Sequence, residues 1–386
     1  MTSAPKLIIA GAFAAVAVTG AWFAQARGGA APVVRTYYIA AEEVDWDFLP
    51  EGDLVSGRAI DSLLNAVKAP GFIGQVYRKA IYREYTDSTF TQLKPRPPEW
   101  EHLGILGPLI RAEVGDTIRV VFHNKASRAY SMHPHGVIYD KDSEGAPYQD
   151  GTSGADKADD GVAPGATHTY VWPVPERAGP SESEGSSSIW MYHSHVDEAK
   201  DVNAGLMGPL IVTARGRARP DGSPVDVDRE IITMFAEFDE NASWYLEDNI
   251  TANIADPSKV DRTFSFTNPF TLSNFMESIN GRSYGNTHIR LQAGQRVRWY
   301  VFASTNFGDL HAPHWHGNVV VANHMRTDVL GLVAMGMHVA DMVPDNEGTW
   351  MFHCHVREHN DFGMQALFTV GPANAVVADA GEHAPH

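Results

Sequence analysis

Cysteine is nearly absent from this chain, which has one such residue, Cys354, among 386. One cysteine excludes a disulfide within the chain. Behind the N-terminal export segment described below, about 360 residues remain, enough for two domains of ordinary size with full hydrophobic cores. In an exported chain without disulfides, a lone thiol is better explained as a metal ligand than as part of the folding scheme.

Basic residues are also scarce. Lysine and arginine number 30 against 47 aspartates and glutamates, which gives a formal net charge of −17 at pH 7. This charge argues against nucleic acid and anionic membrane surfaces as partners. It agrees with a cationic substrate, although solubility alone explains it equally well.

Long hydrophobic runs are lacking outside one N-terminal segment. Residues 7–24 are apolar and rich in alanine, follow Lys6, and lead into the small-residue pattern Ala-Gln-Ala. This order predicts a secretory signal over residues 1–26 that is cleaved after Ala26. An uncleaved membrane anchor is the alternative, because about 18 apolar residues are barely enough to span a bilayer. Either interpretation places the rest of the chain outside the cytoplasm, as a periplasmic or secreted protein.

The chain contains an internal duplication, that is, two copies of one sequence module. Residues 115–123 and 294–302 alternate polar and apolar side chains after a glycine turn, as β-strands do. Farther on, residues 190–195 (Trp-Met-Tyr-His-Ser-His) are echoed by residues 350–355 (Trp-Met-Phe-His-Cys-His). Short strands with frequent glycine and proline, and few long helical periodicities, predict an all-β chain of two Greek-key β-sandwich domains.

The limits of the two domains follow from a turn-rich segment. Residues 220–224, Pro-Asp-Gly-Ser-Pro, are expected to form the linker. We therefore expect domain 1 over residues 36–215 and domain 2 over residues 226–373. Residues 374–386 are expected to be a polar tail.

The cysteine lies among three histidines and a methionine, namely His353, His355, His359 and Met364. A thiolate with imidazoles and a thioether is the ligand set that selects copper for electron transfer, because soft sulfur stabilises Cu(I) while nitrogen tolerates Cu(II). Side chains alternate faces along a strand, so His353 and His355 point to one side and Cys354 to the other. One strand can therefore hold two copper sites and join them covalently.

Three further His-x-His pairs occur: His133 and His135, His193 and His195, and His314 and His316. Together the four pairs supply eight imidazoles from four strand-like segments. That number suits a cluster of about three coppers with positions left open for oxygen species. The ligands that remain for a separate blue-copper site are His311, Cys354, His359 and Met364.

These motifs resemble those of the multicopper oxidases, and the surrounding sequence is similar to the branch of ceruloplasmin and the coagulation-factor A domains. Residues 102–116, 238–250 and 349–355 carry the resemblance most clearly, and it runs from about residue 37 to residue 370. It implies that each β-sandwich is a cupredoxin domain.

The resemblance also implies four coppers per chain: one type 1, one type 2 and two type 3. Type 1 copper would bind the four blue-copper ligands named above, and type 2 copper would bind His133 and His314. The type 3 pair would take His135, His193, His195, His316, His353 and His355. Cys354 would then pass electrons through its backbone to the two flanking histidines, so that the donor and dioxygen never meet.

The two copies have diverged at the blue-copper site. Aligned without gaps, the four blue-copper ligands of the second copy fall opposite Tyr130, Ser194, Ala199 and Ala204 in the first. Without a thiolate a blue site cannot form there. Each domain is thus expected to give four histidines to the cluster, and only the second to carry the electron entry site.

Carboxylates near the copper motifs suggest two further roles. Asp150 resembles the acidic residue that the family places close to the cluster, where it could relay protons through water; Asp197 is a weaker candidate. The alternative for Asp150 is an ordinary Asp-Gly turn. Asp309, Glu358 and Asp361 adjoin the blue-copper histidines and could bind a metal-ion donor, unless they are merely solvated.

We therefore expect an exported multicopper oxidase, laccase-like or ferroxidase-like, that oxidises a phenol, Fe(II) or Cu(I) at type 1 copper and reduces dioxygen to water. The resemblance to two-domain members implies a homotrimer, with each cluster between domain 1 of one chain and domain 2 of its neighbour. One alternative is copper nitrite reductase, which has the same two domains but a blue site in the first. The other is a non-catalytic copper-binding A-domain protein, although none of the twelve expected ligands is missing.

Overall fold

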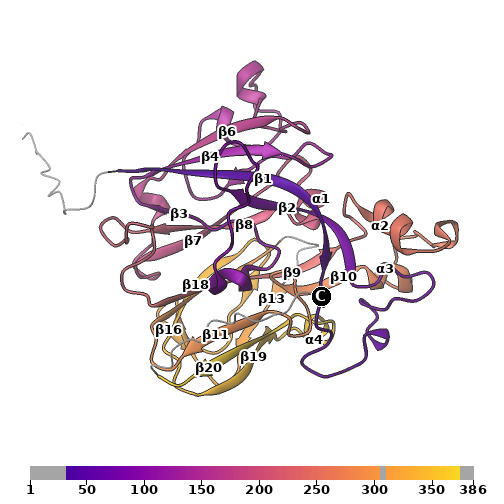
Figure 1. Ribbon diagram of the computed structural model, residues 1–386. Coiled ribbons are helices and arrows are strands. Elements are labelled where there is room, and N and C mark those ends of the chain that lie inside the picture. Colours follow the sequence, from indigo (N-terminus) through magenta and orange to yellow (C-terminus); the bar gives the residue numbers. More distant parts are fainter. Residues whose placement is uncertain (1–31, 305–309, 374–386) are drawn as a thin grey trace, which may run out of the picture.

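The computed structural model describes residues 32–304 and 310–373. The expected signal segment, Asp309 and the expected polar tail lie outside these ranges. Within them the chain is built from β-strands joined by turns and a few short helices (Figure 1). The predicted all-β fold class is confirmed.

Two four-stranded sheets form the first half of the chain, with strand orders β2-β1-β4-β6 and β3-β8-β7-β5. Their strands are β1 (Val34–Asp47), β2 (Val76–Tyr85), β3 (Ile110–Glu113), β4 (Thr117–Asn124), β5 (His133–Pro134), β6 (Thr167–Pro173), β7 (Ser187–His193) and β8 (Met207–Thr213). Phe122 and Trp172 of one sheet share a buried core with Tyr192 of the other. The sheets are therefore packed as a sandwich, with alternate side chains turned inward.

The second half repeats this arrangement with a six-stranded sheet, β10-β9-β12-β18-β15-β16, a four-stranded sheet, β11-β20-β19-β14, and a small pair, β13-β17. Its strands are β9 (Arg229–Asp239), β10 (Phe275–Ile279), β11 (His288–Gln292), β12 (Val297–Ala303), β13 (Leu310–His311), β14 (Pro313–Trp315), β15 (Val320–Ala322), β16 (Met325–Thr327), β17 (Leu332–Val333), β18 (Met337–Met342), β19 (Gly348–Cys354) and β20 (Gln365–Gly371). Trp299, Phe352 and Phe368 fill the core between the two larger sheets.

Helices are short and lie in the connections. The α-helices are α1 (Glu198–Ala204), α2 (Leu246–Asn253), α3 (Pro269–Ser273) and α4 (Arg357–Asp361). The 3-10 helices are η1 (Ile60–Ser62), η2 (Pro98–Leu103), η3 (Lys141–Ser143), η4 (Gly154–Lys157), η5 (Glu176–Ala178) and η6 (Pro257–Lys259).

The register of the strands shows that the two halves are copies of one module. In the first half β5 pairs with β7 so that His133 lies opposite His193. In the second half β14 pairs with β19 so that His314 lies opposite His353. Strand β8 ends at Thr213 and β9 begins at Arg229, which leaves the expected linker between the two copies.

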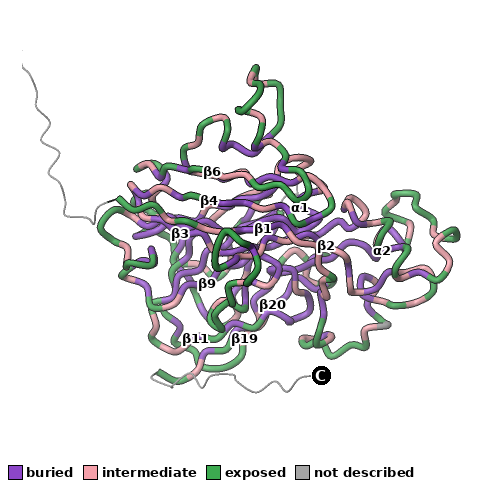
Figure 2. Tube along the Cα trace, turned by 45° about the horizontal axis from the view of Figure 1, so that its top comes forward, coloured by how far each residue is buried: buried purple, intermediate pink, exposed green. Residues whose placement is uncertain are grey.

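The halves are joined by a buried interface. Phe48 and Met191 of the first half belong to one hydrophobic cluster with Met234 and Phe302 of the second. Figure 1 shows the first half above and the second half below, and Figure 2 shows the buried strands continuing between them. The interface places the ends of β5, β7, β14 and β19, which carry the histidine motifs, in one continuous scaffold.

Candidate metal centres

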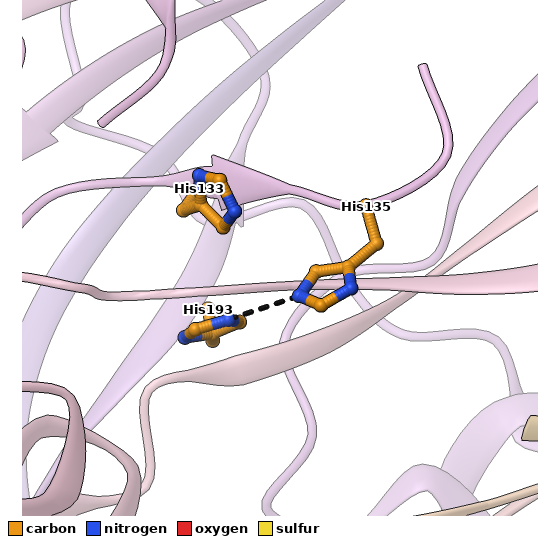
Figure 3. Close-up of side chains that lie close together, drawn as sticks. All are labelled: His133, His135 and His193. Atoms are coloured by element: carbon orange, nitrogen blue, oxygen red, sulfur yellow. Dashed lines mark hydrogen bonds between the residues drawn. The ribbon is translucent and has the colours of Figure 1, made fainter. Parts of the chain in front are cut away.

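The first half gathers the imidazoles of its two His-x-His pairs. Ligand nitrogens of His133, His135 and His193 lie within 4.8 Å of one another. Figure 3 shows the three rings turned toward a common point, with Nε2 of His135 3.1 Å from Nε2 of His193. The His195 ring adjoins them, with its centroid 5.2 Å from that of His133. Strand pairing brings β5 and β7 together and so assembles this group from residues about 60 apart.

The second half gathers its own imidazoles in the same way. Ligand nitrogens of His314, His316 and His353 lie within 4.8 Å of one another, and the Nε2 atoms of His316 and His353 are 3.0 Å apart. The His355 ring centroid is 5.2 Å from that of His314. All eight histidines that the sequence assigned to a cluster therefore lie in two groups of four.

Backbone carbonyl groups fix the proton positions of several of these rings. Nδ1 of His193 lies 3.0 Å from the carbonyl oxygen of Ser194, and Nδ1 of His353 lies 2.8 Å from that of Cys354. Nδ1 of His133 similarly lies 2.6 Å from the carbonyl oxygen of Glu144. A carbonyl oxygen can only accept, so Nδ1 carries the proton and Nε2 keeps its lone pair for a metal.

Burial favours the neutral form of these imidazoles. Burial first, and then the neighbouring imidazoles, lower the pKa of His193 to about 3 and those of His135 and His353 to about 4. Neutral imidazole is the form that binds metal. The donor set and its protonation therefore both fit copper.

The blue-copper ligands form a separate, buried group in the second half. Sγ of Cys354 lies 3.5 Å from Nδ1 of His359 and 3.9 Å from Nδ1 of His311. The backbone N–H of Ala312 donates to this sulfur over 3.3 Å. Met364 is fully buried, and its carbonyl oxygen accepts the backbone N–H of Cys354. A thiolate and two imidazoles, with a methionine buried on the same loop, fit a blue copper.

Hydrogen bonds show which residue of the first half stands in the place of the cysteine. The backbone N–H of Ser131 donates to Oγ of Ser194 over 3.1 Å. This bond repeats the one from Ala312 to the sulfur of Cys354. Ser194 therefore occupies the position of Cys354, as the sequence predicted.

The loop that follows Ser194 in the first half is two residues longer than the loop that follows Cys354 in the second half. The backbone N–H of Ser194 donates to the carbonyl oxygen of Leu206, whereas that of Cys354 donates to Met364. Helix α1 has seven residues and its counterpart α4 has five, which accounts for the difference. Leu206 thus occupies the place of the thioether ligand.

The same loop places a carboxylate where the second half has an imidazole. Leu206 donates its backbone N–H to the carbonyl oxygen of Asp201, as Met364 does to that of His359. Asp201 therefore stands in the place of His359, and the gap-free alignment was wrong for this part of the loop. The residues that it had set opposite His359 and Met364 were Ala199 and Ala204.

The two predicted proton-relay residues lie in different surroundings. Asp150 pairs with Lys157 over 2.9 Å and with Lys141 over 3.2 Å. Hydrogen bonds from Thr152, together with the two lysines, hold the pKa of Asp150 well below its usual range. Asp197 caps α1 and pairs with Lys200 over 2.8 Å. Their role as relays stays a prediction, and an aspartate held as an anion by two lysines takes up protons poorly.

Two glutamates that the sequence analysis missed adjoin the blue-copper group. Glu237 on β9 lies opposite Glu277 on β10, and oxygens of both lie within 4.8 Å of a ring nitrogen of His359. The available signal was the presence of acidic residues within two largely apolar strands, β9 and β10. The candidates named from sequence are more exposed: Glu358 lies at the surface, and Asp361 pairs there with Arg357.

Each candidate group draws its ligands from one half of the chain. Among residues 32–304 and 310–373, no group of three ligand atoms within 4.8 Å combines histidines of both halves. In that same part of the chain, no helix is long and apolar enough to cross a membrane.

Comparison with known proteins agrees with this geometry. Two family models described as multicopper oxidase match residues 103–217 and 255–374. Among curated relatives, human ferroxidase HEPHL1 is 43% identical over 345 residues, human hephaestin 40% over 347 and human ceruloplasmin 39% over 348. These alignments cover 87–88% of this chain but only 29–32% of each relative. The chain thus spans about three-tenths of the length of its relatives.

Solved structures share the fold at low sequence identity. A structure described as a multicopper oxidase superposes with a TM-score of 0.55 at 19% identity, covering 88% of this chain and 89% of the other. Copper nitrite reductase from Nitrosomonas europaea gives 0.55 at 14% identity, covering 91% and 98%. These neighbours confirm the expected pair of cupredoxin-like domains as the architecture.

Proposed function

The chain belongs to the multicopper oxidase family, and from that premise we propose that it couples oxidation of a small one-electron donor to reduction of dioxygen to water. When bound, copper at Cys354 would accept one electron at a time from the donor, and copper at the imidazole groups would supply the four-electron reduction of dioxygen. We propose four coppers per chain: one type 1, one type 2 and two type 3. The complete set of twelve ligands supports this number.

Fe(II) is the donor that the site favours. The supporting observation is the pair of carboxylates, Glu237 and Glu277, whose oxygens lie within 4.8 Å of a ring nitrogen of His359. Hard oxygen ligands suit an iron cation, whereas a phenol would meet two negative charges at this edge. The glutamates would hold the cation beside a ligand of the blue-copper group, which gives a short path for one electron. The acidic net charge of the chain would also favour the approach of cations.

Replacing both carboxylates tests this donor. We expect the double variant Glu237→Gln, Glu277→Gln to lose kcat/KM for Fe(II) by about 10- to 100-fold, since both charges that hold the cation are removed. Oxidation of a phenolic donor and the blue absorption of the Cys354 site should stay unchanged. Glu247→Gln, which alters an exposed carboxylate paired with Arg262, is the matched control. Equal loss with both donors would contradict an iron site.

A homotrimer with clusters between subunits is the assembly that we propose. Its support is the separation of the eight histidines into one group per half, because a cluster that needs both groups can then form where two chains meet. Human hephaestin is also more than three times as long as the aligned part of this chain, so three copies would approach its length. Such a ring would contain six cupredoxin domains.

Nitrite reduction is less well supported. The likeness to copper nitrite reductase is one of fold at 14% identity, which carries no activity. The blue-copper ligands lie in the second half, and two full imidazole groups are present. Both features favour a trinuclear cluster. We further propose that the chain works outside the cytoplasm, either in a periplasm or as a secreted protein.

A further inference from the structure

The segment 238–245, part of the sequence that resembles ceruloplasmin, lies outside every candidate metal group. It begins with the last two residues of β9 in the second half, yet its side chains contact the first half. Nε1 of Trp244 donates to Oδ1 of Asp201 over 2.8 Å. The hydroxyl groups of Tyr245 and Tyr130 are 2.9 Å apart. The segment is therefore packed against the first-half loop that stands where the second half has its blue-copper loop.

The carboxylate of Asp201 is the centre of this contact. The residue is fully buried, and its Oδ2 atom accepts hydrogen bonds from the hydroxyl group of Ser194 (2.7 Å) and from the backbone N–H groups of Val196 (3.0 Å) and Asp197 (3.1 Å). With Trp244, four donors converge on its two oxygens. Four donors suit a carboxylate anion, which can only accept.

Asp201 and Ser194 occupy the positions that two blue-copper ligands occupy in the second half. Ser194 stands in the place of Cys354, and Asp201 stands in the place of His359. In the second half those two ligands would be joined by copper. In the first half they are joined directly, by the hydrogen bond between hydroxyl and carboxylate. The loop that this bond closes begins between two cluster histidines, His193 and His195.

We propose that Asp201 is a positioning residue that replaces the missing blue copper as the organiser of the first-half loop. It holds residues 194–197 in place and thereby keeps His193 and His195 directed at the cluster. Trp244, which belongs to the second half, supplies the fourth hydrogen bond and links the cluster to the domain interface. We call Asp201 together with its four hydrogen-bond donors the clamp. The inference rests on the proposed function only in taking these two histidines as copper ligands.

Asparagine cannot reproduce the clamp, although it has nearly the same shape. Its amide group would bring two N–H donors to a position where donors already point, so at least one partner would be left unsatisfied and buried. The clamp also needs no metal. We therefore expect the first-half loop to be ordered before copper binds.

Hydrogen exchange on the metal-free full chain tests the clamp without reference to oxidase activity. In the wild-type protein, amides of residues 194–197 should exchange slowly before any copper is added. In Asp201→Asn, exchange at residues 194–197 should be about tenfold faster or more, because bonds to a charged acceptor are lost. Unchanged exchange in this variant would overturn the proposal.

Spectra of the copper-loaded protein then distinguish positioning from general stability. Asp201→Asn should keep the blue absorption of the Cys354 site and lose or alter the near-ultraviolet absorption of the type 3 pair, which His193 and His195 would bind, with fewer coppers bound per chain. Parallel loss of both absorptions, or a normal type 3 absorption, would overturn the proposal. If the wild-type protein forms no trinuclear cluster, the proposed function fails while the exchange result still judges the clamp.

A second pair of variants keeps the test decisive should Asp201→Asn fail to fold. Trp244→Phe removes one donor to Asp201 and retains an aromatic ring. Trp46→Phe removes an equivalent indole bond across the same domain interface, from Nε1 to the carbonyl oxygen of Gly281, away from the loop. We expect faster exchange at residues 194–197 and an altered type 3 absorption in the first variant only. Equal behaviour of the two variants would show that the loop does not depend on the clamp.

Discussion

At the scale of single residues, His102 shows how one imidazole joins the two halves without a metal. It lies in η2, where its Nδ1 is 3.0 Å from the carbonyl oxygen of Glu99 and its Nε2 accepts the backbone N–H of Ile232 over 3.2 Å. Only the neutral ring can donate at one nitrogen and accept at the other. Burial accordingly lowers the pKa of His102 to about 3.

This lowered pKa predicts a pH dependence of stability. Between about pH 3 and pH 6.5 the unfolded chain binds a proton at His102 that the folded chain does not, so the free energy of unfolding falls as the pH falls. The slope from this residue is at most about 1.4 kcal/mol per pH unit. In metal-free protein, His102→Gln should flatten the unfolding free energy measured between pH 6 and pH 4. The surface variant His288→Gln should not, and identical profiles for His102→Gln and wild type would contradict the assignment.

At the scale of elements, the glycine that ends each His-x-His-Gly motif allows its strand to pack closely against the neighbouring strand of the sheet. Gly136 has φ +80° and Gly317 has φ +64°, and each lies on a tryptophan of the neighbouring strand. A Cβ atom at Gly136 would lie 2.3 Å from Cδ2 of Trp190, which is three residues before His193 on β7. The close approach of β5 to β7 therefore requires glycine.

Gly136→Ala should disturb both stability and the cluster. We expect a loss of about 2–4 kcal/mol in the free energy of unfolding, because overpacking against the tryptophan adds to the backbone strain. Gly151→Ala is the control, since Gly151 has a similar φ of +79° but open space around it. The control should lose only about 1–2 kcal/mol and retain the type 2 signal. Equal losses in denaturant unfolding would show that strain alone, not packing, sets the cost.

At the scale of the whole molecule, the separation of the two imidazole groups makes the assembly testable. One variant carries His133→Ala and His135→Ala, and the other carries His314→Ala and His316→Ala. Each trimer alone lacks half of every cluster. If clusters form between subunits, random mixing of the two unfolded and refolded chains should restore about a quarter of the type 2 signal, because intact halves then meet by chance.

Assembly within one chain predicts a different result. No mixture would then recover any type 2 signal, since every chain lacks one of the two groups it needs. Blue absorption of the Cys354 site should persist in both variants and serves as the control for folding. Sedimentation of the mixture would show whether the recovered signal belongs to trimers.

The sequence by itself determined the fold class and the duplication, and it predicted the candidate ligand set. Copper ligands belong to few residue types, and alternation along a strand dictates that Cys354 and its flanking histidines serve different sites. The same alternation, broken by glycine and proline, marked the β-sandwiches. These features depend on residues close together in the sequence, so residue type and side-chain alternation were enough to predict them.

Only the tertiary structure decided how residues far apart in sequence meet. Glu237 and Glu277 reach His359 because β9 pairs with β10 beside the blue-copper loop. Asp201 takes the place of His359 because α1 is two residues longer than α4, a difference that a gap-free comparison conceals. Strand pairing, loop length and packing between domains set these contacts, and they depend on the whole fold rather than on any one segment.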